Sequence, residues 1–126
     1  MKRSVELAIK GIKRRLGFFG EGRAAKYLKN QGYNIIARNY RCPFGEVDII
    51  AERGDVVAFT EVKTRSSERF GTPSEAVDAD RMRRYVRCAQ FYFSERERDV
   101  TVRFDVIEVT KEGINHIENA FEGGEF

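Results

Sequence analysis

Residues 45–64 read GEVDIIAERGDVVAFTEVKT, two runs of alternating character on either side of a Gly-Asp dipeptide. The alternation predicts two strands, over 46–51 and 56–64, that form the arms of a β-hairpin. Gly54 and Asp55 suit a two-residue turn, because glycine and aspartate readily adopt the backbone angles that such turns require. The two strands are therefore expected to pair with each other in a sheet.

This turn also fixes which residues face each other across the hairpin. The opposed pairs are Ile50 and Phe59, Asp48 and Glu61, and Glu46 and Lys63. Because side chains alternate between the faces of a strand, the four charged residues gather at one end of one face. The opposite face is core-like and carries Val47, Ile49, Ala51, Ala58, Thr60 and Val62. A slip of one residue in the register would scatter the charged cluster.

The remaining sequence predicts an α/β domain with a central mixed sheet flanked by helices. The other expected elements, in chain order, are a basic amphipathic helix over 1–16, a helix over about 18–31, a strand over 33–40, a turn over 42–45, a long helix after Pro73, and strands over 100–110 and 114–117. The buried face of the long helix is predicted to carry Met82, Tyr85, Val86, Ala89 and Phe93. The element order ααβββαββ places residues 17–126 in a single domain.

Glu21 is the one charged residue on an otherwise apolar stripe of the helix over 18–31. The stripe continues with Ala24, Ala25 and Leu28 at helical spacing, and Gly32 supplies a stop signal. An amphipathic helix packs such a stripe against its sheet. We therefore expect the Glu21 carboxylate to be pressed toward the charged end of the hairpin.

Asp48 and Glu61 would repel each other, because paired Cβ atoms in a sheet lie about 5 Å apart. At this distance two carboxylates repel by roughly 3 kcal/mol at an effective dielectric of about 20. Either a cation lies between them, or one carboxyl is protonated, or water surrounds both. Carboxylate oxygens suit Mg²⁺ or Mn²⁺, so if a cation lies there, Asp48 and Glu61 are its expected ligands. Glu21 would bind through water or hold a second ion, and Lys63 would hold a water or a phosphate oxygen nearby.

Each of these residues also has an ordinary structural explanation. A Glu-x-Lys pair in a strand usually lies on a solvent-exposed face. Asp48 could be a charge that keeps an edge strand soluble. Glu21 could be stabilised by the helix dipole near the N-terminus of its helix. Their combination favours a functional site. His116 is the single histidine and is expected to be a polar strand residue, which leaves no Ser-His-Asp or Cys-His arrangement. Asp105, beside Arg103, is expected to be structural.

The 126-residue chain has a formal net charge of +3, and its charges are unevenly distributed. Basic residues dominate 1–15 and 81–98, whereas 112–126 contain acidic residues and no Lys or Arg. Sixteen of the 23 basic residues are arginines, whose guanidinium groups bind phosphate in a bidentate manner. This balance favours a polyanionic partner such as nucleic acid, although such charge runs are also typical of solvated helix faces.

The composition excludes several classes of protein. No apolar run approaches the roughly 18 residues that span a bilayer, and the basic N-terminus is not followed by the apolar core of a signal peptide. Cys42 and Cys88 are far apart in the sequence and fit neither a disulfide framework nor a metal cluster. We therefore expect a cytoplasmic protein with no membrane partner.

After its first fifteen residues the sequence resembles the YraN family of small bacterial proteins along nearly its whole length. The resemblance rests on motifs that occur in a fixed order. They are Gly17-Phe18-Phe19-Gly20-Glu21, Ala25-Lys26-Tyr27-Leu28, Gly32-Tyr33, Arg38-Asn39-Tyr40-Arg41, Gly45-Glu46-Val47-Asp48-Ile49-Ile50-Ala51, Glu61-Val62-Lys63-Thr64-Arg65, Phe70-Gly71, Glu75-Ala76-Val77, Arg103-Phe104-Asp105-Val106, His116-Ile117 and Asn119-Ala120-Phe121.

The YraN family in turn is similar to the PD-(D/E)xK nucleases, nearest the archaeal Holliday-junction resolvases. This resemblance implies a restriction-endonuclease-like fold. It matches Glu21 to the helix glutamate of those enzymes and Asp48 to their strand aspartate. Glu61 and Lys63 match the E-x-K pair, and Val47 replaces the proline of the superfamily's name, a loss that the superfamily tolerates.

The activity implied by the resemblance is a Mg²⁺- or Mn²⁺-dependent endonuclease that acts on DNA and selects a structure such as a junction or a flap. Arg65, Arg81 and Arg84 are the expected contacts to backbone phosphates. Junction-cleaving relatives act as dimers, which makes a homodimer one expectation. The first alternative is a nucleic-acid-binding accessory protein whose nuclease-like site is inactive. A protein-interaction adaptor that uses the N-terminal helix is a further alternative.

Overall fold

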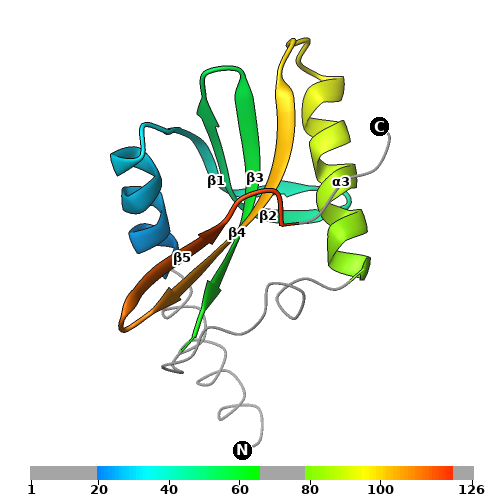
Figure 1. The fold of residues 1–126 in the computed structure, drawn as a ribbon. Helices are drawn as coiled ribbons and strands as arrows, with labels where there is room; N and C mark the ends of the chain where they lie inside the picture. The colour runs from blue at the N-terminus through cyan, green and yellow to red at the C-terminus, as the bar shows by residue number, and fades with distance from the viewer. Residues whose placement is uncertain (1–19, 66–78, 121–126) are drawn as a thin grey trace, which may run out of the picture.

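A computed structural model describes residues 20–65 and 79–120 of the chain. In these residues, five strands form one mixed sheet in the order β1-β2-β3-β4-β5 (Figure 1). The strands are β1 (Asn34–Cys42), β2 (Gly45–Arg53), β3 (Val56–Thr64), β4 (Thr101–Thr110) and β5 (Gly113–Ile117). Residues 20–30 are helical, and α3 spans Ala79–Ser94. The predicted α/β class with a central mixed sheet is confirmed.

The predicted hairpin is present as the antiparallel pair β2 and β3. Arg53 pairs with Val56 around the Gly54-Asp55 turn, and Gly54 has a φ of 61°, in the left-handed region that favours glycine. β3 and β4 are parallel, with α3 in the connection between them. The helix predicted over 1–16 lies outside the described residues, as do residues 66–78 and 121–126.

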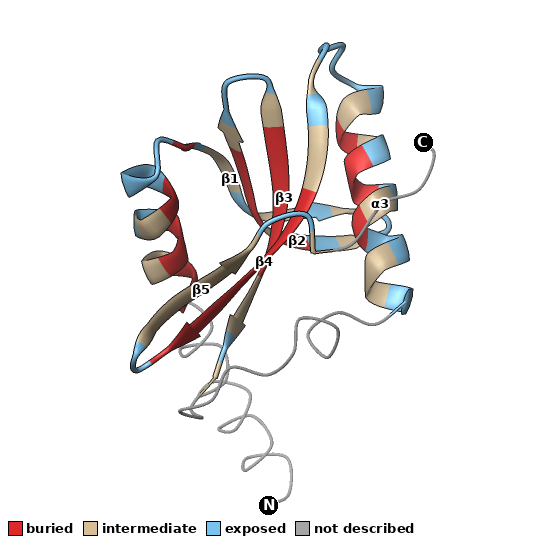
Figure 2. Cartoon of the chain, viewed as in Figure 1, coloured by how far each residue is buried: buried red, intermediate tan, exposed pale blue. Residues whose placement is uncertain are grey.

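The two helices cover opposite faces of the sheet, each over its own apolar cluster (Figures 1 and 2). The buried members of the first cluster are Ala24, Ala25, Leu28, Tyr33, Ile49, Ala51, Ala58, Ile107 and Val109. The buried members of the second are Val47, Ile50, Val57, Phe59, Tyr85, Cys88, Ala89, Tyr92, Phe104 and Val106. Burial of both faces explains the nearly continuous apolar runs in the central strands. No helix among the described residues is long and apolar enough to cross a membrane.

The buried face of α3 differs in part from the prediction. Tyr85 and Ala89 are buried as expected, but Cys88 and Tyr92 are buried as well. The predicted Met82, Val86 and Phe93 are only partly buried. The Tyr92 ring packs edge-on against Phe59, with 5.9 Å between ring centroids. An aromatic ring with a polar tip can fill a core position that a simple apolar pattern assigns to solvent.

Cys42 and Cys88 meet in space although they are far apart in the sequence. Their Sγ atoms lie 2.9 Å apart, and both thiols are free. Cys42 ends β1, and Cys88 lies on the buried face of α3. The contact fixes the end of the β1–β2 hairpin against the helix.

The sheet separates into two parts at the charged end of the hairpin. The register of β2 with β3 runs from Arg53↔Val56 to Ile49↔Thr60. Beyond this point β2 stays paired with β1 as far as Cys42↔Gly45, and β3 stays paired with β4 as far as Thr64↔Val109. The predicted pairs that involve Asp48 and Glu46 are therefore not formed, and a gap opens between the strands.

Val47 was expected on the same face as Ile49 but packs in the α3 cluster instead. The change of face occurs at Asp48. The neighbouring strand, β1, is irregular at the same position along the sheet. Asn39, which lies between the pairs Arg38↔Ile49 and Tyr40↔Val47, has a φ of 52°. Asparagine tolerates this left-handed conformation better than most residues, and the regular alternation of faces is lost.

Candidate functional site

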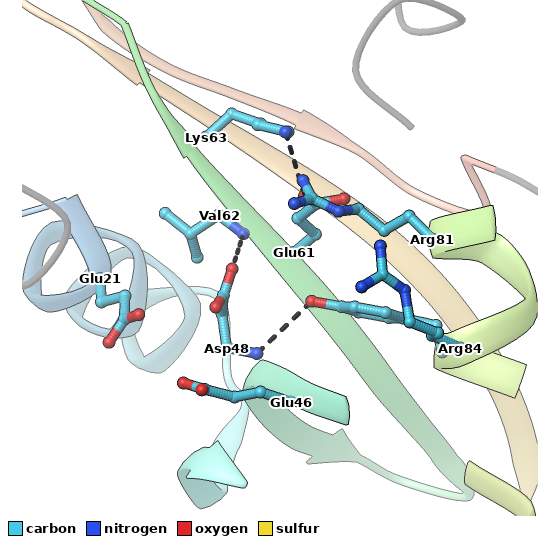
Figure 3. A pocket seen from close by; sticks show the side chains of 9 residues that line it. Glu21, Glu46, Asp48, Glu61, Val62, Lys63, Arg81 and Arg84 are labelled. Carbon is cyan, nitrogen blue, oxygen red and sulfur yellow. Dashed lines mark hydrogen bonds and ion pairs between the residues drawn. The ribbon is translucent and has the colours of Figure 1, made fainter. Parts of the chain in front are cut away.

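A pocket of about 410 Å³ lies where β2 and β3 separate (Figure 3). It is lined by Glu21, Glu46, Asp48, Glu61, Val62, Lys63, Arg81, Arg84 and Tyr85. The helix over residues 20–30, both strands of the hairpin and α3 each contribute to this lining. The structure thus brings together all four residues of the predicted charged cluster and adds Glu21, as the apolar stripe on its helix predicted.

The Asp48 carboxylate bridges the gap between the strands. Its Oδ2 accepts a hydrogen bond of 2.8 Å from the backbone N–H of Val62 in β3. The pKa of Asp48 is raised from 3.8 to about 6, chiefly by burial and also by nearby carboxylates, while the hydrogen bond from Val62 opposes the shift. The carboxylates that raise the pKa are Glu21, Glu61 and Glu46. The site therefore favours a positive charge beside Asp48.

Glu61 is buried and meets two cations through one oxygen. Lys63 Nζ lies 3.1 Å from Glu61 Oε1, and an Arg81 guanidinium nitrogen donates to the same atom. The second oxygen, Glu61 Oε2, is buried and accepts no hydrogen bond from the described residues. A buried carboxylate oxygen without a donor is costly, and a bound cation would satisfy it.

Glu21 reaches the pocket from the other side of the gap. Figure 3 shows the carboxylates of Glu21 and Glu46 pointing toward each other, whereas that of Asp48 points toward the Val62 N–H. Burial raises the pKa of Glu21, while a hydrogen bond from Asn39 and the charge of Arg38, 3.9 Å away, lower it. Among the described residues Glu21 Oε2 also lacks a hydrogen-bond donor.

Glu46 is the least enclosed carboxylate of the pocket. The predicted hairpin register placed it opposite Lys63. Its carboxylate lies 3.5 Å from the Arg41 guanidinium, and its side chain is 41% exposed. The loss of the β2–β3 ladder beyond Ile49 removes Glu46 from its place opposite Lys63.

The fit of the pocket to a divalent cation is mixed. In the two described ranges, no three His, Cys, Asp or Glu side chains lie close enough together to hold one ion. The carboxylates of Glu21, Asp48 and Glu61 therefore line one pocket without closing around a single ion position. Asp48 and Glu61 nevertheless supply hard oxygen donors on both sides of the gap, and the donorless Glu61 Oε2 fits a cation. The residues thus suit an ion that completes its coordination with water.

The three arginines proposed for phosphate contact are differently placed. Arg81 and Arg84 line the pocket from the first turns of α3. Arg65 does not line it, and its Nε lies 3.7 Å from the carboxylate of the buried Glu108. Arg65 therefore neutralises a core carboxylate.

Tyr85 and Asn39 contribute to the site and were missed as site residues. The Tyr85 hydroxyl accepts a long hydrogen bond of 3.4 Å from the Asp48 N–H and donates one of 3.5 Å to the Thr60 carbonyl. It thereby bridges β2 and β3 where their ladder ends. Tyr85 follows Arg81 by four residues, so helical spacing could have placed both on one face. Asn39 could have been found as an asparagine inside a strand pattern, a signal for an irregular backbone.

The Asp105 carboxylate is structural, as expected. It accepts hydrogen bonds from the Arg103 guanidinium, from His116 Nε2 and from the Asn119 N–H. The side chains of Asp105 and His116 are 0% and 6% exposed. His116 therefore holds β5 against β4 and lies outside the pocket.

Comparison with known proteins assigns the chain to a family. The model of "Uncharacterised protein family UPF0102" matches residues 20–109. A UPF0102 protein from Alkaliphilus oremlandii is 50% identical over 117 residues, which cover 87% of this chain and 100% of the relative. One from Persephonella marina is 42% identical over 104 residues, covering 82% and 90% of the two chains. These matches confirm the resemblance to the YraN family, and the chain belongs to that family, UPF0102.

Proposed function

We propose that this protein is a metal-dependent endonuclease that hydrolyses phosphodiester bonds in DNA, with a restriction-endonuclease-like arrangement of sheet and helices. The observation that carries the proposal is the meeting of Glu21, Asp48, Glu61 and Lys63 in one pocket. Carboxylates that raise the pKa of a buried neighbour oppose folding. Their convergence beside a lysine is better explained by catalysis than by stability.

Asp48 and Glu61 are the residues that would hold Mg²⁺ or Mn²⁺. The chemistry that such an ion supplies when bound is polarisation of the phosphodiester and activation of a water nucleophile. Glu61 keeps Oε2 directed away from its two cationic partners, which contact Oε1. Glu21 would act from the helix side, through water.

Lys63 is the residue that would orient the attacking water and offset the negative charge developing on the phosphorus centre. Its Nζ is held 3.1 Å from Glu61 Oε1, so the ammonium group stays beside the proposed metal ligand. Arg81 shares this carboxylate oxygen in the structure. A DNA phosphate would compete with Glu61 for the Arg81 guanidinium, and Arg84 would contact a neighbouring phosphate.

Cleavage of a labelled panel of four-way junction, flap, duplex and single-stranded DNA with Mg²⁺ or Mn²⁺ tests the proposal. Wild-type protein is expected to cut at least one substrate. Lys63→Met should bind the same substrate but cut it about 100-fold more slowly, because it lacks the group that orients water. The exposed Lys111→Met provides the matched control. The mass of the protein in solution, measured on the same samples, tests the expected homodimer.

The alternative function is an accessory protein that binds nucleic acid without cutting it. The ion pairs of Glu61 with Arg81 and Lys63 favour it, because two cations already offset the negative charge that would attract a metal ion. This alternative predicts salt-sensitive binding with every substrate, no cleavage with either metal, and no effect of the Lys63 substitution beyond a small loss of affinity.

A further inference from the structure

A second hollow, of about 610 Å³, adjoins the pocket on the side of α3. Pro43 and Phe44, the turn between β1 and β2, form one wall. Asp80, Arg83, Arg84 and Arg87 of α3 form the other. Arg84 lines both hollows and therefore lies between them. We call this second hollow the arginine–Phe44 hollow.

Phe44 presents an aromatic ring at the surface. It is 41% exposed, whereas the other large hydrophobic residues in the described ranges are buried or half-buried. The ring is held in place, with the Arg87 guanidinium 5.8 Å from its centroid and the Phe91 ring edge-on at 6.3 Å. An ordered, exposed aromatic ring beside a guanidinium group is a platform on which a flat π system can stack.

The charge of the hollow favours an anion. Three arginines face one acid, and that acid, Asp80, is ion-paired with Arg83. Arg84 and Arg87 are exposed. The Cys42 contact with Cys88 and the hydrogen bond from the Phe44 N–H to Cys42 Sγ hold the turn against α3. These contacts keep the Phe44 ring beside the face of α3 that carries Arg87.

We propose that the arginine–Phe44 hollow binds an unpaired nucleotide of the DNA strand, with its base stacked on Phe44 and its flanking phosphates bound by Arg84 and Arg87. The inference rests on the proposed nuclease function and names its substrate class as DNA with unpaired nucleotides beside the cleavage position. In a duplex the faces of each base are covered by neighbouring bases. Only an unpaired base can stack on a protein ring in this way.

Binding measured in EDTA tests the hollow independently of cleavage. The probe is a labelled oligothymidylate of about 12 nucleotides, compared with a duplex of equal length. The full chain is expected to bind the single strand more tightly. Phe44→Ala should weaken single-strand binding about 10-fold with no change for the duplex, and Phe44→Trp should restore it.

The arginines are tested through the salt dependence of the same binding. Arg87→Ala should lower the slope of log affinity against log salt by about 0.7, the value of one phosphate contact on a single strand. Arg98→Ala is the matched control, because Arg98 pairs with Glu52 at the other end of β2 and should leave the slope unchanged. Equal lowering by both substitutions would contradict the assignment of this phosphate contact.

Equal affinity for single strand and duplex would overturn the proposal, and so would single-strand binding that is unchanged in Phe44→Ala. Metal-dependent cleavage that is insensitive to Phe44→Ala would also overturn it while leaving the nuclease intact. Single-strand binding that depends on Phe44, without cleavage by the wild type, would support the hollow and overturn the nuclease. The two claims can therefore fail separately.

Discussion

Asp48 is held in the pocket at an energetic cost. Burial and the surrounding carboxylates raise its pKa to about 6, whereas an unfolded aspartate has a value of 3.8. A raised pKa in the folded state means that the charged form opposes folding. The contribution of Asp48 to stability is full below pH 3.8 and is lost as the pH rises through about 6. At neutral pH the residue therefore lowers the free energy of unfolding.

Asp48→Asn should accordingly stabilise the metal-free protein at pH 8, by at most about 3 kcal/mol, because the amide oxygen can still accept from Val62 and carries no charge. The gain should vanish at pH 4. Urea unfolding of both proteins at the two pH values measures it. Asp80→Asn, at a carboxylate that is 79% exposed, is the control and should change stability little at either pH. A less stable Asp48→Asn variant at pH 8 would contradict this account.

Gly20 shows how one missing side chain sets the position of an element. A Cβ atom at this position would overlap Thr64 Oγ1 and lie 3.2 Å from Thr64 Cβ, so the helix over residues 20–30 lies directly on the end of β3. The same close approach carries Glu21, the next residue, to the pocket. A Cβ atom at Gly22 would meet nothing within 4 Å.

Gly20→Ala should therefore destabilise the protein by about 1–3 kcal/mol, since the helix or Thr64 must shift. Gly22→Ala should be neutral or stabilising by up to about 1 kcal/mol, because alanine is the better helix former. Denaturant unfolding of the two variants provides a matched pair. Equal effects of the two substitutions would show that the contact with Thr64 does not set the position of this helix.

The Asp105 network joins β4, β5 and the segment that follows them. Burial alone would raise the pKa of Asp105, but hydrogen bonds from His116, Arg103 and the Asn119 N–H outweigh it and hold the pKa below 3.8. A lowered pKa means that the stability from this carboxylate is present above pH 3.8 and is lost as the pH falls through the folded value.

Asp105→Asn should cost about 3 kcal/mol at pH 7, because it leaves the buried Arg103 charge without its partner. The cost should shrink at pH values below 3.8, where the wild type also loses the charge. Thermal unfolding followed across this range measures the effect. Glu118→Gln removes a 53%-exposed carboxylate that lies 3.8 Å from the same arginine, and it should cost less than about 1 kcal/mol. A cost of Asp105→Asn that does not change with pH would argue against the network.

The elements, and the Ile50–Phe59 pair across the hairpin, were predictable from local patterns, whereas several contacts that join distant elements were not. The alternation in residues 45–64 predicted β2, β3 and their turn, because periodicity and turn chemistry act over a few residues. The point where the hydrogen-bonded pairing of β2 with β3 ends, at Ile49 and Thr60, could not be predicted in the same way. It coincides with the hydroxyl of Tyr85, which comes from another element and lies between the strands.

At the scale of the whole molecule, the site exists because the sheet opens at one end. Residues from both faces can then share one pocket: Glu21 comes from the helix on one side, and Arg81 comes from α3 on the other. The sequence pattern identified Glu21, Asp48, Glu61 and Lys63 as a group from their residue types and faces. The pattern could not reveal that the Arg81 guanidinium pairs with Glu61 Oε1, or that Arg65 pairs with Glu108. Both ion pairs join distant parts of the chain.

Metal-dependent DNA cleavage, compared between wild type and Asp48→Ala, tests the central claim most directly. Both proteins are treated with EDTA, dialysed, and assayed on the same junction, flap, duplex and single-stranded DNA before and after addition of Mn²⁺ or Mg²⁺. The wild type is expected to cleave DNA only after metal is added, and Asp48→Ala is expected not to cleave it at equal DNA affinity. Cleavage by Asp48→Ala at the wild-type rate, or binding without cleavage by both proteins, would contradict the central claim.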